Sequence, residues 1–261
     1  MLTIVMPMAG EGRRFVDAGY KTPKPFIDVA GKPMIQRAWE GLPPADEWVF
    51  VCRKGHEARL RWLLQQSAPE GAIHLRVLTG TTQGPACTVL EAEDRVNPAW
   101  PLLCADCDQV IVWDPEVFCA DARSADGMLV TFPATALCYS YARVDRGQVT
   151  EVREKEPISP HAIAGAYYWR TAGLASLALR AMVHCGEHVH GEFYLAPAYN
   201  ELIRAGLSVR AFPVARVWSL GTPEALQYAL VHGPWGGDDH TDGQTPEAVD
   251  ANRAASPWGE A

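Results

Sequence analysis

The sequence has no excess of basic residues and no long apolar run. Its formal net charge is −8 over 261 residues, and residues 233–261 hold −5 of it because they carry six acids and one arginine. Proteins that bind nucleic acid or a membrane surface normally present a basic face, so neither partner is expected. No apolar stretch approaches the ~20 residues that span a bilayer, and no basic segment precedes the first expected strand.

The seven cysteines do not form the pattern of a disulfide framework. Their number is odd, and most of them lie in apolar runs. Reduced thiols in a cytoplasmic protein are the simplest account of them. The CxxC pair of Cys104 and Cys107 has no second pair and lies within an acidic motif, so a zinc or redox role is not favoured.

The composition is that of an ordinary globular protein, with 48% hydrophobic and 21% charged residues. The length suits one large α/β domain, which we expect over residues 1–232. Residues 233–261 are rich in Gly, Asp and Pro, and this composition predicts a disordered acidic tail. Trp235 and Trp258 are unusual in such a tail, and docking of these side chains on the domain is the alternative.

Strand-like and helix-like segments alternate in the first half of the chain. Strands are expected at 2–8, 48–52, 73–78 and 101–105, and helices from 33 onward, at 56–66 and at 85–93. Such alternation predicts βαβ units and a mostly parallel sheet. The second half is richer in strands. Extended segments are expected there at 128–132, 138–144, 149–153, 163–169 and 208–213, and helices at 171–184, 194–205 and 223–230.

The strongest chemical signal follows the first strand. Residues 7–15 read Pro-Met-Ala-Gly-Glu-Gly-Arg-Arg-Phe, and Lys24 follows between two prolines. Glycines after a strand let backbone N–H groups close on an anion, and Pro23 and Pro25 hold the Lys24 backbone extended. The pattern therefore predicts a site for phosphate groups, with a surface turn carrying solvated bases as the alternative.

This segment resembles the signature of the nucleotide-sugar pyrophosphorylase family, the GT-A-like nucleotidyltransferases. The resemblance covers roughly residues 1–230. Within the family, the sequence most resembles the branch found among capsule and cell-surface biosynthesis proteins. It implies an α/β fold with a Rossmann-like three-layer mixed sheet, mostly parallel, with a strand-rich acceptor-binding half. It also implies that Arg14 and Lys24 are catalytic and hold the triphosphate and the acceptor phosphate. The implied nucleotide-binding residues of the loop are Ala9, Gly10, Glu11, Gly12 and Arg13.

A second matching segment is Thr81-Thr-Gln-Gly-Pro. The amide of Gln83 can both donate and accept, so it can read a pyrimidine edge. The resemblance places this turn against the nucleobase, with Gly84 leaving room for the base. CTP or UTP/dTTP is therefore favoured. A plain turn before a helix is the alternative.

Two carboxylates follow the fourth strand, where open α/β sheets bind ligands. Asp106 and Asp108 are two residues apart and can share one side of an extended segment. The resemblance implies that Asp108 is the main Mg²⁺ ligand and that Asp106 assists it beside the nucleotide. Ser219 stands where relatives carry a second aspartate, so either Asp106 or Glu192 replaces it, or the ion keeps more water. Strand-end caps are the alternative.

The acceptor-binding residues are implied only by the resemblance. Lys155, preceded by Glu154, would hold the acceptor phosphate. Gly165 would leave room for the body of the acceptor, and Glu192 would face hydroxyl or amine groups.

The sequence thus predicts a cytoplasmic, Mg²⁺-dependent nucleotidyltransferase. It would transfer the NMP part of an NTP to a small phosphorylated acceptor, such as a sugar phosphate, and release pyrophosphate. A homodimer is left open. One alternative is a GT-A glycosyltransferase that uses a nucleotide sugar. Another is a non-catalytic nucleotide-binding regulator, suggested by Ser219.

Overall fold

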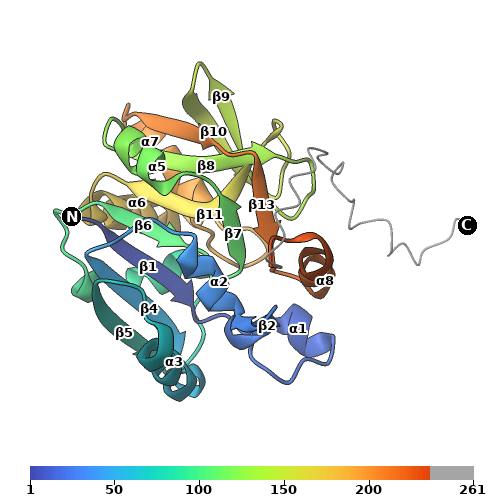
Figure 1. Ribbon diagram of the computed structural model, residues 1–261. Helices are drawn as coiled ribbons and strands as arrows, with labels where there is room; N and C mark the ends of the chain where they lie inside the picture. The colour runs from blue at the N-terminus through green and yellow to red at the C-terminus, as the bar shows by residue number, and fades with distance from the viewer. Residues whose placement is uncertain (236–261) are drawn as a thin grey trace, which may run out of the picture.

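The computed structural model describes residues 1–235, which are built around a central sheet (Figure 1). In chain order the strands of this sheet are β1 (Thr3–Met8), β4 (Glu47–Arg53), β5 (Ala72–Leu78), β6 (Leu102–Ala105), β8 (Gly127–Pro133), β9 (Ser140–Asp145), β10 (Gln148–Glu154), β11 (His161–Trp169) and β12 (Val209–Pro213). Two short ladders stand apart from it. They are β2 (Asp28–Val29) with β3 (Lys32–Pro33), and β7 (Gln109–Val112) with β13 (Arg216–Ser219).

Helices connect most of these strands. They are α1 (Arg13–Asp17), α2 (Met34–Glu40), α3 (Lys54–Ser67), α4 (Pro85–Leu90), α5 (Pro115–Ala122), α6 (Ala172–His184), α7 (Tyr199–Arg204) and α8 (Pro223–His232). Three short 3₁₀ turns complete the set, at Lys24–Phe26, Glu93–Arg95 and Ala196–Ala198. Within residues 1–235, none of the helices has the length and hydropathy needed to cross a bilayer.

The strand order of the central sheet is β5-β4-β1-β6-β11-β8-β12-β10-β9. The four strands from β5 to β6 are parallel, and β12 is parallel to β8. Antiparallel pairs gather in the second half, around β11 and β10. There β9 and β10 are joined through Arg146 and Gly147, which both have positive φ, as a two-residue hairpin turn requires. The predicted mixed α/β class is confirmed, and its parallel part is mainly the first half.

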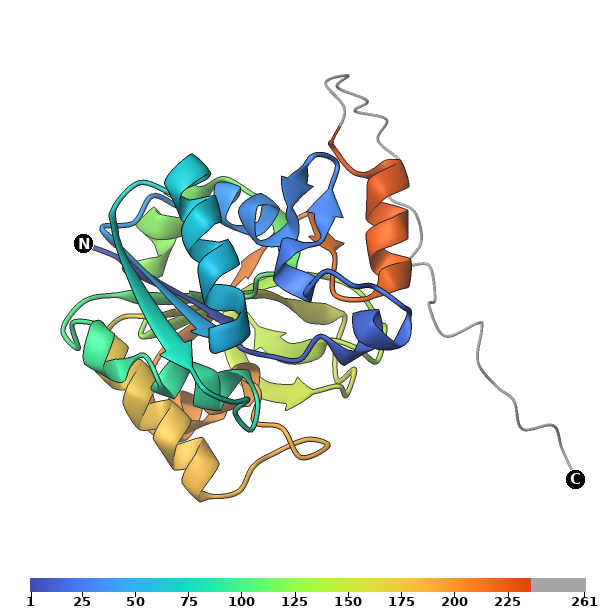
Figure 2. The same ribbon diagram turned by 90° about the horizontal axis from the view of Figure 1, so that it is seen from below.

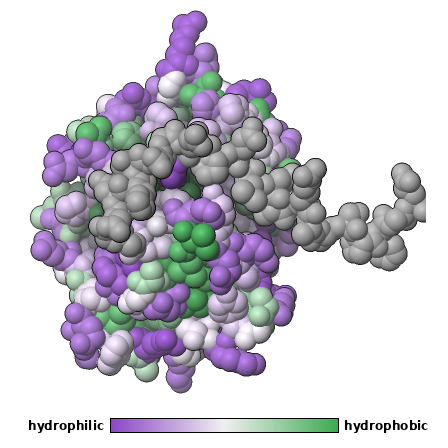
Figure 3. Space-filling model, turned by 45° about the vertical axis from the view of Figure 1, so that its right-hand side comes forward, coloured by the Kyte–Doolittle hydropathy of each residue, from purple (hydrophilic) through white to green (hydrophobic). Residues whose placement is uncertain are grey.

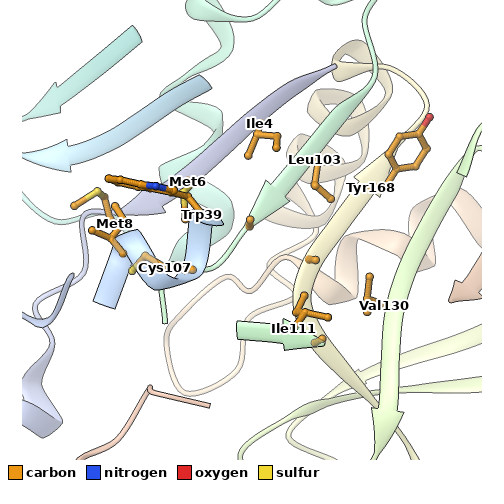
Figure 4. Packing of buried hydrophobic residues seen from close by; sticks show 14 of the residues in the cluster. Ile4, Met6, Met8, Trp39, Leu103, Cys107, Ile111, Val130 and Tyr168 are labelled. Carbon is orange, nitrogen blue, oxygen red and sulfur yellow. The ribbon is translucent and has the colours of Figure 1, made fainter. Parts of the chain in front are cut away.

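Alternating side chains of each strand pack into two cores on opposite faces of the sheet. In β1, Ile4, Met6 and Met8 join the core that contains residues of α2, α3 and α5 (Figure 4). Val5 points the other way, into the core shared with α4, α6 and α7. Because side chains alternate along a strand, both faces of β1 are buried and the helices form the two outer layers. The predicted three-layer arrangement is confirmed.

A third, smaller cluster links the glycine loop region to the end of the domain. Phe15 of α1 packs there with Trp218 of β13 and Leu226 of α8. Viewed from below, α8 accordingly lies beside the segment of α1 and β2 (Figure 2). Figure 3 shows a surface that is mostly hydrophilic, with a small hydrophobic area near its centre.

The expected tail begins inside the described residues, and its first part is docked. The Trp235 indole N–H donates to the carbonyl of Ala229 at 2.5 Å, and the Arg37 guanidinium lies 5.0 Å from its ring centroid. Trp235 is therefore docked on the domain, which was the alternative to a disordered tail. The expectation that the tail begins at residue 233 is wrong for Trp235. Trp258 and the rest of the tail lie outside the described residues.

Most predicted elements are present within a few residues of their expected bounds, but α1, α5 and the short strands β2, β3, β7 and β13 were not predicted. The sequence signal for α5 is Asp114 followed by Pro115. The Asp114 carboxylate accepts from the N–H groups of Glu116 and Val117 and so caps the helix. The strands of β2, β3 and β7 have two to four residues, too few for a periodic pattern.

Docking of Trp235 predicts a measurable contribution to stability. Trp235→Ala removes the indole hydrogen bond and the contact with Arg37, and should cost about 1–2 kcal/mol, or about 3–6 °C in melting temperature. Trp62→Ala is the matched control because that indole is 60% exposed. Differential scanning calorimetry of both variants should show a shift for Trp235→Ala alone. Equal shifts in melting temperature for the two variants would mean that the Trp235 contacts add nothing beyond what an exposed indole contributes.

Candidate active site

A cavity of about 670 Å³ opens at the carboxyl ends of β1 and β6. Parallel strands that end at one edge place their following loops together, which is why open α/β sheets bind ligands there. The cavity brings together predicted site residues from six separate segments of the chain. The predicted site residues that line it are Ala9, Gly10, Glu11, Gly12, Arg13, Arg14, Lys24, Gln83, Gly84, Asp106, Asp108, Glu154, Lys155 and Glu192.

The glycine loop is shaped by its approach to Lys24. Gly12 has φ +66°, and a Cβ on it would stand 3.0 Å from the Lys24 Cβ. A side chain at this position would therefore be strained and would also push Lys24 away. Gly10 has no heavy atom within 4 Å of its Cβ position, so its space is open to the cavity. Arg13 and Arg14 follow at the exposed start of α1, where Arg13 pairs with Glu11 at 2.5 Å.

Lys24 and Asp108 form an ion pair between two elements that are 84 residues apart. The Lys24 ammonium donates to Asp108 Oδ2, and the two side chains are only 24% and 17% exposed. Burial is the largest single effect and lowers the pKa of Lys24, but the charge of Asp108, the hydrogen bond to it and the neighbouring charges together outweigh burial, so the pKa is raised above its ordinary value. The cation is therefore fixed at the strand end where the carboxylates lie.

Asp106 lies deeper, against the backbone of β11. Its N–H donates to the Gly165 carbonyl at 2.8 Å, and the Gly165 N–H donates to Gln109 Oε1 at 3.0 Å. A Cβ on Gly165 would meet the Asp106 Cβ at 2.6 Å. Gly165 was expected to leave room for the acceptor, but it is absent from the cavity lining and makes room for the Asp106 side chain.

The electrostatics of Asp106 are those of a crowded anionic site. Burial, followed by the charge of Asp108, raises the pKa of Asp106 to about 7, although the Lys24 cation opposes this shift. Two carboxylates in such proximity are stabilised by added positive charge. Of the two carboxylates proposed to replace the missing aspartate, Asp106 is the one beside Asp108. Glu192 instead accepts from Tyr194.

Ser219 lies near Asp108 of the carboxylate pair, at the position where the resemblance implied a second aspartate. It is opposite Gln109 in the β13–β7 ladder, and a Cβ on Gly221 would stand 2.7 Å from Asp108 Oδ2 and 3.8 Å from Ser219 Oγ. The donors gathered here are carboxylate and hydroxyl oxygens, the type that Mg²⁺ prefers. Among the described residues, no group of three His, Cys, Asp or Glu side chains is arranged to hold a metal.

The two cysteines of the acidic motif are not prepared for redox or metal chemistry. Burial raises the pKa of Cys107 to about 12 and raises that of Cys104 well above its ordinary value. The thiolate is the reactive and metal-binding form, so both residues are ordinary buried side chains.

The loop expected to contact the base is tied by backbone hydrogen bonds to the segment that carries Glu192 and Tyr194. The Phe193 N–H donates to the Gln83 carbonyl at 2.7 Å, and the Ala86 N–H donates to the Phe193 carbonyl at 3.0 Å. Gly84 has φ +111°, and a Cβ on it would stand 2.6 Å from the Phe193 carbonyl oxygen. The close approach that requires glycine here is therefore that of Phe193. The Gln83 side chain is exposed at the cavity wall.

The cavity lining also carries Glu154, Lys155 and Glu192. The Ser140 hydroxyl donates to Glu154, whose pKa burial raises. The Lys155 ammonium donates to the Tyr194 hydroxyl, which in turn donates to Glu192. Tyr194 and Ser140 were missed by sequence reasoning. Tyr194 follows Glu192 by two residues, and this spacing was the available signal, since it suits two side chains on one side of an extended segment.

The fold and the cleft define a nucleotide-binding α/β enzyme of the nucleotidyltransferase class. The family model described as a MobA-like NTP transferase domain matches residues 4–141. The chain belongs to this family and is a nucleotidyltransferase. This membership favours the predicted activity over the glycosyltransferase alternative. No curated protein matches the chain.

Solved structures agree with this assignment. The chain is similar to a nucleoside-diphosphate-sugar pyrophosphorylase from Vibrio cholerae RC9, with 26% identity, a TM-score of 0.78 and coverage of 87% of this chain and 99% of that one. An inositol-1-phosphate CTP transferase from T. maritima shares 13% identity, with a TM-score of 0.65 and coverage of 89% and 96%. A UDP-glucose pyrophosphorylase complexed with UDP-glucose shares 14%, with a TM-score of 0.72 and coverage of 88% and 97%. The last two show the fold alone.

The position of Gly165 gives a test of the carboxylate site. Gly165→Ala places a methyl group against the Asp106 Cβ, and should cost about 1–3 kcal/mol and displace Asp106. Gly55→Ala is the control, because Gly55 lies in α3 with nothing within 4 Å of its Cβ position. Chemical denaturation should show Gly165→Ala destabilised and Gly55→Ala unchanged or slightly stabilised. Wild-type stability in Gly165→Ala would contradict the observed contact.

Proposed function

We propose that the enzyme joins the NMP part of a pyrimidine NTP to a small phosphorylated acceptor, with Mg²⁺ as cofactor. The observation that carries the proposal is the Lys24–Asp108 ion pair, which lines the same cavity as the glycine loop, Lys155 and Glu192. In the proposal, the Lys24 cation serves both the nucleotide and the acceptor.

The reaction needs two polyanions in one place. An oxygen of the acceptor phosphate attacks the α-phosphorus of the NTP, a new P–O bond forms, and the bond to the β-phosphate bridging oxygen breaks, so that pyrophosphate leaves. The nucleophile is already an anion and needs no general base, so catalysis consists of positioning and charge neutralisation. Arg14 and Lys24 supply fixed positive charge to the triphosphate, and Lys155 supplies it to the acceptor phosphate.

The residues that would hold Mg²⁺ are Asp108 and Asp106. The raised pKa of Asp106 reflects an anionic site that gains from a cation, and Ser219 adds a hydroxyl oxygen beside it. Mg²⁺ commonly uses one or two carboxylates and completes its octahedron with phosphate oxygens and water. When bound, the ion neutralises phosphate oxygens. Relatives carry an aspartate where this chain has Ser219. Its replacement is compatible with an ion that takes only one or two ligands from the protein.

Further parts of the proposal rest on the sequence. The amide of Gln83 supports CTP or UTP/dTTP as donor. A cytoplasmic location follows from the cysteine pattern, which fits reduced thiols. A role in capsule or cell-surface biosynthesis follows from the resemblance, and a homodimer is left open for the assembly.

The test is a pyrophosphate-release screen of CTP, UTP, dTTP, ATP and GTP against a panel of phosphorylated acceptors in the presence of Mg²⁺. Release that depends on one acceptor, with the nucleotide conjugate identified by mass spectrometry, is the expected result. Binding of NTP without turnover by any acceptor would instead support the non-catalytic regulator.

The kinetic role of Lys24 can be measured directly. Its charge is needed most when negative charge gathers at the α-phosphorus, so Lys24→Ala should lower kcat by about ten- to several-hundred-fold, with a smaller change in NTP affinity. Lys54→Ala is the control, because Lys54 is exposed at the start of α3 and lies outside the cavity lining. Equal and small effects of both substitutions in steady-state kinetics would remove Lys24 from the proposed mechanism.

Lys24 also predicts an effect on metal binding. The Lys24 ammonium donates to an oxygen of Asp108, so Lys24→Met should tighten Mn²⁺ binding by about tenfold, because a nearby positive charge is removed. Asp108→Asn should weaken Mn²⁺ binding and lower turnover by ~10² or more. Electron paramagnetic resonance titration of free Mn²⁺ measures both. Unchanged affinity in both variants, or full activity in excess EDTA, would contradict the proposed metal site.

A further inference from the structure

The acceptor side of the cavity contains a continuous polar chain of three side chains. The Lys155 ammonium donates to the Tyr194 hydroxyl at 2.5 Å, and this hydroxyl donates to Glu192 Oε2 at 2.6 Å. The same ammonium lies 4.3 Å from the centroid of the Tyr194 ring. All three residues line the cavity. Since the hydroxyl has one proton, its direction in this chain is determined: it accepts from the cation and donates to the anion.

The backbone holds both ends of this chain in place. Lys155 has φ +57°, and its N–H donates to the Tyr139 carbonyl at 3.0 Å, so the chain turns sharply as it leaves β10. At the other end, Val189 and Glu192 exchange two backbone hydrogen bonds of 3.0 Å around a two-residue turn. The two turn residues, His190 and Gly191, both have positive φ, as a tight hairpin requires.

Phe193 anchors the segment between Glu192 and Tyr194. Its side chain is buried, and its backbone makes the two hydrogen bonds to Gln83 and Ala86 described above. The Tyr194 side chain is half-buried, and burial raises the pKa of its hydroxyl, with the hydrogen bond to Glu192 adding to the shift. The phenol therefore stays protonated and keeps its donor.

We propose that Tyr194 is a specificity-determining residue that sets Lys155 and Glu192 side by side, so that the site selects phosphate monoesters carrying a hydroxyl or amine donor close to the phosphate. The Lys155 ammonium has two remaining N–H groups for phosphate oxygens, and Glu192 has a second carboxylate oxygen free of this chain to accept from the ligand. This inference rests on the proposed function, and it adds to it a positioning residue, Tyr194, through which the site discriminates between acceptors.

The expected difference in affinity between ligands with and without a donor follows from the solvent exposure of Glu192 and Tyr194. Glu192 is exposed and Tyr194 is half-buried, so the contact with a ligand donor is partly screened by water. A ligand without donors loses this contact but keeps the one between its phosphate and Lys155. The difference in affinity between the two kinds of ligand should therefore be about three- to tenfold, as for a charge-assisted hydrogen bond of modest strength.

Three ligands of equal chain length separate these contributions. Propyl phosphate carries no donor in its body, glycerol 1-phosphate carries two hydroxyls, and 3-aminopropyl phosphate carries an amine. Isothermal titration of the full chain in the presence of Mg²⁺ should show the latter two binding about three- to tenfold more tightly than propyl phosphate. In Tyr194→Phe, which keeps the ring under Lys155, this advantage should fall below about twofold, while the affinity for propyl phosphate stays within about twofold.

Tyr228→Phe is the matched control, because it removes a phenol hydroxyl from α8, outside the cavity lining. It should keep the wild-type order of affinities. Equal affinities for the three ligands, an advantage that persists in Tyr194→Phe, or no binding of any of them would overturn the inference. The pyrophosphate-release screen reports on the proposed function separately. Turnover without this discrimination refutes the inference alone, and discrimination without turnover by any acceptor refutes the proposed function alone.

Discussion

The Lys24–Asp108 ion pair is the interaction on which the arrangement of the cleft depends. It joins the segment after the glycine loop to the end of β6, two parts of the chain that are 84 residues apart. Around it, Gly12 adopts a positive φ so that its backbone can approach Lys24. The pair also keeps a positive charge next to two carboxylates, Asp106 and Asp108. Their mutual repulsion would otherwise destabilise the folded state. The same geometry places the cation in the cleft, where the proposed reaction gathers phosphate charge.

A second junction connects the nucleotide side of the cleft to its acceptor side. The backbone of Phe193 bonds to Gln83 and Ala86, and Gly84 is the residue that allows this close approach. Glu192 and Tyr194 flank Phe193, so the residues proposed for the base and for the acceptor are held by one short backbone ladder. On the opposite side, Gly165 performs a similar task by admitting the Asp106 side chain against β11. Both glycines make room for groups of the protein itself, and the proposed ligand contacts fall to neighbouring side chains.

Much of the fold could be predicted because it follows from local patterns. The short apolar runs of β1 and β4, which alternate with helical segments along the chain, imply buried parallel strands and two outer layers. The antiparallel second half could be read as strand-rich, but its pairing depends on contacts between distant segments, such as β11 with both β6 and β8. Short elements escaped prediction, since β7 has four residues and α1 five. Trp235 was placed in the tail because composition alone does not reveal a partner such as Arg37.

The sequence by itself determined the class of the protein and the types of residue at its site: a glycine loop with Arg14 and Lys24, two carboxylates after a central strand, and Lys155 with Glu192 further along. These follow from short motifs whose spacing is local. Only the tertiary structure decided how these residues are paired. It brought Lys24 into an ion pair with Asp108 and packed the Asp106 side chain against Gly165. It also placed the Tyr194 hydroxyl between Lys155 and Glu192. The physical reason is that hydrogen bonds and ion pairs act over a few Å, and for residues far apart in the chain such distances are set only when the sheet and its connecting loops have folded.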